Sequence, residues 1–273
     1  MADDGMLVAK RKMLFDETSE RYDVVFIGDS SCGAGLVPNS FDSMSVLNAG
    51  TFASFTIAGY TDMALEILDS KHPPKAIVIT FLPRSLEVTS EDTHKFGIYV
   101  RYCIAYEKDS LAGPIPLDQY WQLFLRRRTV NRFPPKYGGS YKNFLANLES
   151  TKGWLPEQSV FKESQRKETT FHSSTWAITL MDRISEKAKE KDCQVFLCFT
   201  PRPKSVATLQ YWEQATKSTE KIADCRDWKF LNIGNGVWDD DLFGTESHLT
   251  PDGASRFSSI IKKQLQQSIQ TSL

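Results

Sequence analysis

Five short apolar runs constrain the fold of this chain more than any other feature. They cover residues 22–28, 45–50, 76–82, 194–200 and 229–234, and Val, Ile and Phe dominate them. Each run stops at glycine, proline or small polar residues. Continuous apolar runs of this length are typical of strands that are buried on both faces of a parallel sheet. The sequence therefore predicts a five-stranded parallel sheet.

Helical periodicity fills much of the chain between and after these runs. Apolar faces recur at helical spacing within 57–68, 177–188 and 254–265. The last pattern has a start signal, because Thr250 can cap a helix and Pro251 suits its first position. Alternating strands and helices imply an α/β fold, a flavodoxin-like three-layer sandwich with helices on both faces of the sheet.

Residues 84–172 interrupt this alternation. They contain helical stretches such as 118–128 but no convincing strand, and they carry 14 Lys and Arg against 10 Asp and Glu. The rest of the chain carries 19 Lys and Arg against 24 Asp and Glu. We therefore expect residues 1–273 to form a single domain, with 84–172 as a basic insertion that caps one end of the sheet.

Composition excludes several classes of protein. With 41% hydrophobic and 25% charged residues the chain has the balance of a globular protein, not of a disordered one. A net charge of −1 gives no general attraction to nucleic acid. The five cysteines are scattered without zinc-ligand spacing, so we expect free thiols. No metal and no organic cofactor is implied.

The sequence contains no membrane segment and no signal-peptide run. The first 15 residues have no long apolar stretch, and nothing approaches the roughly 20 apolar residues of a membrane helix. A cytoplasmic location is expected for the chain as written, and an extracytoplasmic one if a signal or anchor once preceded it. The oligomeric state stays open.

A serine and a histidine fall on the same rim of the predicted sheet. Gly28-Asp29-Ser30 directly follows the first strand, and His248 lies between the fifth strand and the last helix. Loops at the carboxyl ends of parallel strands form the ligand crevice of such a sheet. A serine needs a neighbouring base to become a nucleophile, and histidine suits that task near neutral pH. Backbone N–H groups at the start of the following helix can stabilise an oxyanion.

Three motifs resemble the conserved blocks of the SGNH (GDSL-type) hydrolases. The first is VVFIGDSSCGAGL, the second is LNAG and the third is SHLTPDGASRFS. The resemblance implies Ser30 as nucleophile, His248 as general base, and the N–H groups of Ser30 and Gly50 as the oxyanion hole. It covers both ends of the chain and the sheet core, but not the insertion.

Two positions depart from the pattern of that family. Where the family has an oxyanion-binding Asn after the third strand, this chain reads Phe-Leu-Pro-Arg84-Ser85, which leaves Arg84 and Ser85 as substitutes. The family's acid lies three residues before the histidine, where this chain has Thr245. Glu246 is the expected acid, and 239–241, a run of three aspartates, is the alternative.

The segments YDVVFIGDSS to VPNSFD and the Gly-Trp pair at 153–154 resemble a membrane-associated branch of the family. That branch contains polysaccharide O-acetylation proteins and the D-alanine transfer proteins of teichoic acid synthesis. The resemblance to that branch implies an ester hydrolase or O-acyltransferase that acts on an acyl ester, with acylated carbohydrate as a candidate substrate. Side chains of the insertion that could contact such a substrate are Trp121, Arg126, Arg127 and Arg128. The rival hypothesis is a catalytically weak scaffold that binds or assembles components in glycan processing.

Overall fold

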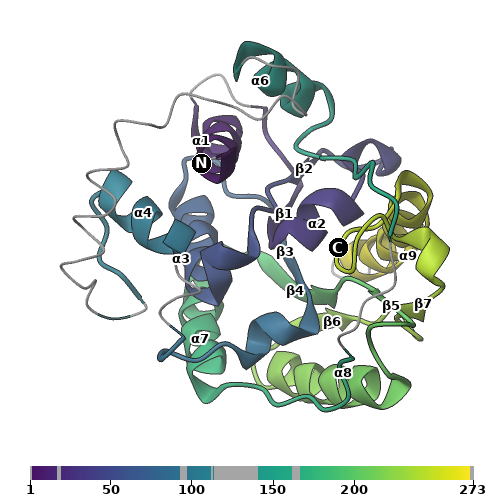
Figure 1. The fold of residues 1–273 in the computed structure, drawn as a ribbon. Coiled ribbons are helices and arrows are strands. Elements are labelled where there is room, and N and C mark those ends of the chain that lie inside the picture. Colours follow the sequence, from purple (N-terminus) through teal and green to yellow (C-terminus); the bar gives the residue numbers. More distant parts are fainter. Residues whose placement is uncertain are drawn as a thin grey trace.

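The fold is described from a computed structural model, which defines residues 2–16, 20–92, 97–111, 113, 141–161 and 167–270. Five parallel strands form its central sheet (Figure 1). They lie in the order β2-β1-β3-β4-β6, which is the flavodoxin-like order. Their bounds are β1 Val24–Gly28, β2 Val46–Asn48, β3 Ala76–Phe81, β4 Gln194–Phe199 and β6 Lys229–Leu231. The predicted α/β class and the five-stranded parallel sheet are thus confirmed.

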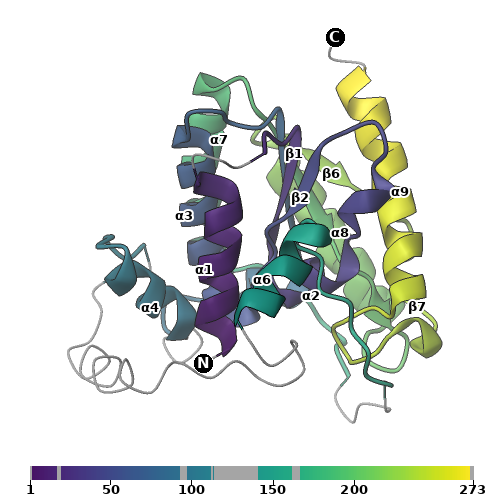
Figure 2. The ribbon, with the colours of Figure 1, turned by 90° about the horizontal axis from the view of Figure 1, so that it is seen from above.

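Helices cover both faces of the sheet, as Figure 2 shows from above. α3 and α7 pack together on one face with α1 beside them, and α8 and α9 cover the other face with the short α2. Their bounds are α1 Ala2–Phe15, α2 Ser30–Gly35, α3 Thr56–Asp69, α7 Thr175–Glu190, α8 Leu209–Asp224 and α9 Pro251–Gln270.

The apolar periodicity of the sequence accounts for these helix positions. The last helix begins at Pro251, and the Thr250 hydroxyl accepts a hydrogen bond from the Gly253 N–H. Its predicted inward face is fully buried, as is most of the face predicted for α3 and for α7. Burial of these stripes against the sheet supplies the main favourable contribution to folding.

A second, two-stranded sheet was not predicted. β5 (Arg202–Pro203) pairs with β7 (Val237–Trp238) in parallel beyond the carboxyl ends of β4 and β6. Each strand has only two residues, which is too short for an alternation pattern to stand out in a sequence. The pair joins two loops that lie near His248.

The chain between β3 and α7 contains helices in its described parts. These are η3 (Pro83–Glu87), α4 (Gly97–Ala105) and α6 (Tyr141–Ser150). The predicted helix at 118–128 lies outside the described residues. The role of 84–172 as a cap stays a prediction, but α6 leads into a loop, 151–161, that returns to the sheet edge at β2.

No helix within the described ranges is long and apolar enough to cross a membrane. The five cysteines, which all lie in described parts of the chain, are free thiols, and four of them are buried.

Candidate active site

Ser30 stands at the first position of α2, directly after the turn that ends β1. Gly28 has φ +152°, and a Cβ built there would lie 1.6 Å from the Thr80 carbonyl oxygen. Only glycine therefore permits this close approach of β1 to β3. Asp29 caps the helix by accepting a hydrogen bond from the Ser31 N–H at 2.9 Å. The turn thus presents Ser30 at the carboxyl rim of the sheet with its side chain partly exposed.

His248 reaches Ser30 from the loop before α9. Its Nε2 lies 2.8 Å from Ser30 Oγ, within hydrogen-bond reach of a nucleophile and its base. The His248 N–H donates to the hydroxyl of Thr245 at 3.0 Å, and the Gly244 N–H donates to the His248 carbonyl at 2.9 Å. Thr245, at the position where the family has its acid, therefore shapes the turn that carries the histidine.

The acid beside His248 is Glu157, which the sequence analysis missed. His248 Nδ1 and Glu157 Oε2 are 2.9 Å apart, and the Glu157 side chain is 18% exposed. Its second oxygen accepts hydrogen bonds from the Gln158 N–H, the Ser159 N–H and the Ser159 hydroxyl, at 3.0, 3.0 and 2.7 Å. Burial alone raises the pKa of Glu157, but the hydrogen bonds from Ser159 and His248 outweigh it and lower the pKa to about 2.

The expectation that Glu246 or 239–241 would supply this acid is corrected by these contacts. Glu246 points its carboxylate toward Arg84, with Oε1 3.9 Å from Nη1. Asp239 pairs with Lys204 at 2.7 Å, and Asp240 accepts from the Ser205 N–H at 3.2 Å. The position next to His248 is filled by a carboxylate from the stretch between β3 and β4, which local spacing around the histidine cannot reveal.

The loop that carries Glu157 is fixed to the edge of the sheet and to α2, the helix that begins at Ser30. The Asn48 N–H at the end of β2 donates to the Lys152 carbonyl at 2.9 Å, and the Leu155 N–H donates to the Gly33 carbonyl at 3.1 Å. Trp154 Nε1 donates to the Ala34 carbonyl at 2.9 Å. Loop 151–161 therefore lies along β2 and α2 before it reaches His248.

Two glycines make room for this loop. Gly153 has φ +90°, and a Cβ there would lie 2.0 Å from the Asn48 carbonyl oxygen. A Cβ at Gly244, in the histidine loop, would lie 2.7 Å from Glu157 Cγ. The close packing at both positions sets where the Glu157 carboxylate lies.

Asp29 ties together the ends of three strands. Its Oδ1 accepts from the Ser31 hydroxyl, which also lies 2.7 Å from the Thr200 hydroxyl after β4. Its Oδ2 accepts from the Leu82 N–H at 3.0 Å and the Ser85 hydroxyl at 3.1 Å. Ser85, a predicted substitute oxyanion donor, therefore has its hydroxyl bound to Asp29 and is 8% exposed.

Gly50, the second predicted oxyanion donor, lies against the nucleophile helix. A Cβ there would lie 2.5 Å from the Gly33 nitrogen and 2.9 Å from Cys32 Cβ. Its N–H, however, donates to Asn48 Oδ1 at 3.0 Å. An oxyanion could receive the Gly50 N–H only by sharing it with Asn48. The Ser30 N–H has no partner among the described residues and remains available.

Arg202 anchors the histidine loop and was not predicted. It is fully buried and binds Glu168 through two hydrogen bonds of 3.0 and 2.9 Å. Its third nitrogen donates to the Glu246 carbonyl at 2.5 Å, two residues before His248. An arginine two residues beyond the apolar run 194–200 was the available signal, since a buried arginine needs a partner.

The predicted substrate contacts in the insertion lie outside the described residues. They are Trp121, Arg126, Arg127 and Arg128. Arg84 is described, and its side chain is 27% exposed at the rim that holds Ser30 and His248. Across the described ranges, no group of three or more His, Cys, Asp or Glu could hold a metal ion.

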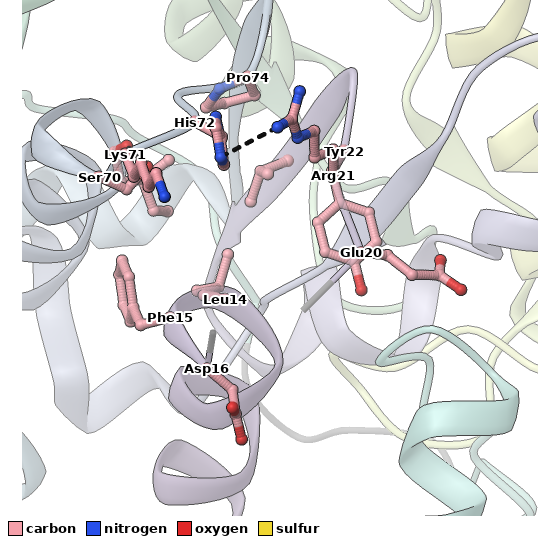
Figure 3. Close-up of a pocket in the computed structure, with 12 residues that line it drawn as sticks. Leu14, Phe15, Asp16, Glu20, Arg21, Tyr22, Ser70, Lys71, His72 and Pro74 are labelled. Atoms are coloured by element: carbon pink, nitrogen blue, oxygen red, sulfur yellow. Dashed lines mark hydrogen bonds between the residues drawn. The ribbon is translucent and has the colours of Figure 1, made fainter. Parts of the chain in front are cut away.

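A cavity of about 550 Å³ lies at the opposite end of the sheet (Figure 3). Tyr22, before β1, and Pro74, before β3, line it, so it opens at the amino ends of these strands. Arg21 and His72 meet across it at 3.1 Å. Because neither Ser30 nor His248 lines this cavity, its size does not identify the reactive site.

Comparisons with known proteins agree with this fold. No family model matches the sequence, and no curated protein matches it. A solved structure from Streptococcus pneumonia, described provisionally as a platelet activating factor, is similar over 97% of this chain and 92% of its own, with 12% identity and a TM-score of 0.51. At that identity the similarity shows a shared α/β fold, and the chemistry of this chain must be argued from its own residues.

Proposed function

We propose that this protein is a serine ester hydrolase whose catalytic triad is Ser30, His248 and Glu157. One observation carries the proposal: a continuous relay of 2.8 and 2.9 Å contacts runs from the serine hydroxyl through the imidazole to an ionised carboxylate. Such a relay is recognised by its geometry and by the role of each group, and it recurs on unrelated folds in different chain orders. The similar solved structure supports the hydrolase class through its fold alone.

Each member of the relay has a defined step. His248 Nε2 takes the proton of Ser30 as Oγ attacks the acyl carbonyl, and the carbonyl oxygen becomes an oxyanion. Glu157 holds the imidazole in the tautomer with a proton on Nδ1 and stabilises the imidazolium that forms. His248 then protonates the leaving alcohol, which departs and leaves an acyl ester on Ser30. Water, activated by the same histidine, releases the acid and restores the serine.

Stabilisation of the oxyanion is the weakest element of this site. The Ser30 N–H points from the first turn of α2 and is the leading donor. The Gly50 N–H joins it only when shared with Asn48 Oδ1. Loss of one oxyanion donor costs about 3 kcal/mol of transition-state stabilisation in a known protease. A slow hydrolase is therefore expected.

This weakness favours one rival, a binding or assembly scaffold with little activity. A fluorophosphonate probe followed by hydrolysis of a small aryl acetate separates the two. The hydrolase predicts stoichiometric labelling at Ser30, loss of labelling in Ser30→Ala and in His248→Ala, and turnover that depends on both residues. A wild-type protein that the probe does not label supports the scaffold and contradicts the hydrolase.

Acyl transfer to a carbohydrate is a finer proposal within the same chemistry. It rests on the sequence resemblance and on the basic 84–172 segment, which could attract an anionic glycan across the otherwise acidic chain. Transfer predicts that added sugar polymer captures the acyl group in place of water. It also predicts that replacing Arg126, Arg127 and Arg128 by Gln weakens glycan binding most at low salt. If only free acid is released in the presence of glycan, acyl transfer is contradicted and hydrolysis is the reaction.

A further inference from the structure

Lys10 places a charged side chain inside the protein, beneath the nucleophile helix. It lies on α1 and is fully buried. Its Nζ donates to the Gly50 carbonyl and lies 3.8 Å from where a Cβ on Gly33 would be. Gly33 belongs to α2, whose first residue is Ser30. The ammonium therefore lies beside the Gly50 carbonyl and against α2, three residues along that helix from Ser30.

No carboxylate balances this charge within the described part of the chain. The titratable group that faces Lys10 is the Cys32 thiol of α2, and burial raises the pKa of that thiol, which keeps it neutral. Asp29, on the same helix turn, receives its hydrogen bonds from Ser31, Leu82 and Ser85.

The other elements that pack on α1 offer no counter-charge either. On the α3 and α4 side, Glu66 pairs with Arg11 and Lys108. On the α6 side, the buried neighbours are the apolar Phe144 and Leu148. Burying an ammonium without an ionised partner is costly for folding, so Lys10 is a feature that packing alone does not explain.

We propose that the buried ammonium of Lys10, held on the Gly50 carbonyl, supplies positive charge to the oxyanion that forms at Ser30. This inference rests on the proposed hydrolase. Lys10 does not touch the substrate; it acts as a positioning residue through the Gly50 peptide and through its field. That field compensates for the missing side-chain donor after β3 and for the Gly50 N–H that Asn48 occupies. A charge fixed in the protein interior acts more strongly on a nearby developing anion than the same charge in water.

The proposal makes a specific statement about pH. Burial lowers the pKa of Lys10 from 10.5 to about 7. The ammonium is then present below pH 7 and lost above it. We therefore expect kcat of the wild type to fall as pH rises through about 7.

Two variants of the full chain, Lys10→Met and Lys10→Gln, test the proposal when kcat is measured with a small aryl acetate. Both remove the charge, and Gln can still donate a hydrogen bond to Gly50. We expect kcat to fall about tenfold or more at pH 6, as for loss of one charge near a buried anion, with KM unchanged and the alkaline fall in rate abolished. Lys12→Met, an exposed site on the same helix, is the matched control and should match the wild type.

Stability separates this effect from misfolding. Below pH 7 the folded protein carries a buried ammonium that the unfolded chain solvates, so Lys10→Met should be more resistant to urea than the wild type, most clearly at acidic pH. A variant that is more stable yet slower supports the proposal. Wild-type kcat and an unchanged pH profile in both variants would overturn it while leaving labelled Ser30 intact. A wild type that the fluorophosphonate fails to label would overturn the hydrolase and this inference together.

Discussion

Glu157 and Glu246 lie close to the same histidine turn but have different surroundings. Glu157 receives hydrogen bonds from Ser159, Gln158 and His248, and its pKa is lowered to about 2. It therefore stays ionised at any pH where His248 can act as a base. Glu246 is 41% exposed, and its carboxylate faces Arg84 at 3.9 Å. A single amide substitution at each position separates their roles.

Glu157→Gln should slow ester hydrolysis strongly, whereas Glu246→Gln should leave the rate near that of the wild type. The amide keeps the shape of the side chain, but it favours the wrong tautomer of His248 and cannot stabilise the imidazolium, a change worth roughly 10⁴ in kcat in a known triad. Steady-state hydrolysis of an aryl acetate at pH 7 and above measures both variants. Equal rates for Glu157→Gln and the wild type would show that Ser30 and His248 work as a dyad.

At the scale of elements, loop 151–161 decides where the acid lies. It is held by backbone hydrogen bonds to Asn48 and Gly33, and by the close approach of Gly153 to the Asn48 carbonyl. The loop thus couples the edge strand β2 to the charge beside His248.

Gly153→Ala should destabilise the protein and lower kcat together. The new Cβ would enter a space 2.0 Å from the Asn48 carbonyl oxygen at φ +90°, so the loop must move and carry Glu157 with it. Strained backbone of this kind costs about 1–3 kcal/mol before the clash is counted. Gly234→Ala is the control, because Gly234 also has positive φ, +71°, but no atom lies within 4 Å of its added Cβ. Thermal unfolding and kcat should change far more for Gly153→Ala, and equal effects would mean that backbone strain alone is responsible.

The arrangement of the elements explains why the sequence predicts the positions of Ser30 and His248 but not that of Glu157. Ser30 directly follows β1, and His248 lies on the connection from β6 to α9. The parallel sheet brings the carboxyl ends of its strands to one rim, so the topology places both residues there. Glu157 follows no strand. Its position depends on a glycine turn docking against the β2 edge, which is a long-range contact that leaves no local pattern. The role of Arg202 was not predicted for a similar reason, because its partner Glu168 lies on a segment distant in the sequence.

At the scale of the whole molecule, Arg202 joins three parts of the chain. It follows β4, binds Glu168 in the segment before α7, and donates to the Glu246 carbonyl in the histidine loop. Arg202 is 0% exposed and Glu168 is 7% exposed. Global stability and the placement of His248 therefore depend on the same buried pair.

Arg202→Met should destabilise the fold by about 3–5 kcal/mol, because it leaves the Glu168 carboxylate buried without its partner. Adding Glu168→Met should recover much of that loss, since two apolar side chains of similar size can replace a buried ion pair with little net cost. Urea denaturation of the single and double variants measures both effects. Additive losses in the double variant would show that the two residues contribute independently.

Loop 151–161 also has a consequence for how such a protein can be redesigned. In the proposed triad, Ser30 and His248 lie on segments that follow strands of the sheet. Glu157 lies on the connection between β3 and β4, and loops of this kind vary most easily between proteins. A chimera that swaps the whole connection to change substrate preference would delete the acid at the same time. A successful graft must retain η3, loop 151–161 and α7, together with Gly244 in the histidine loop, which leaves the residues between η3 and α6 as the exchangeable part.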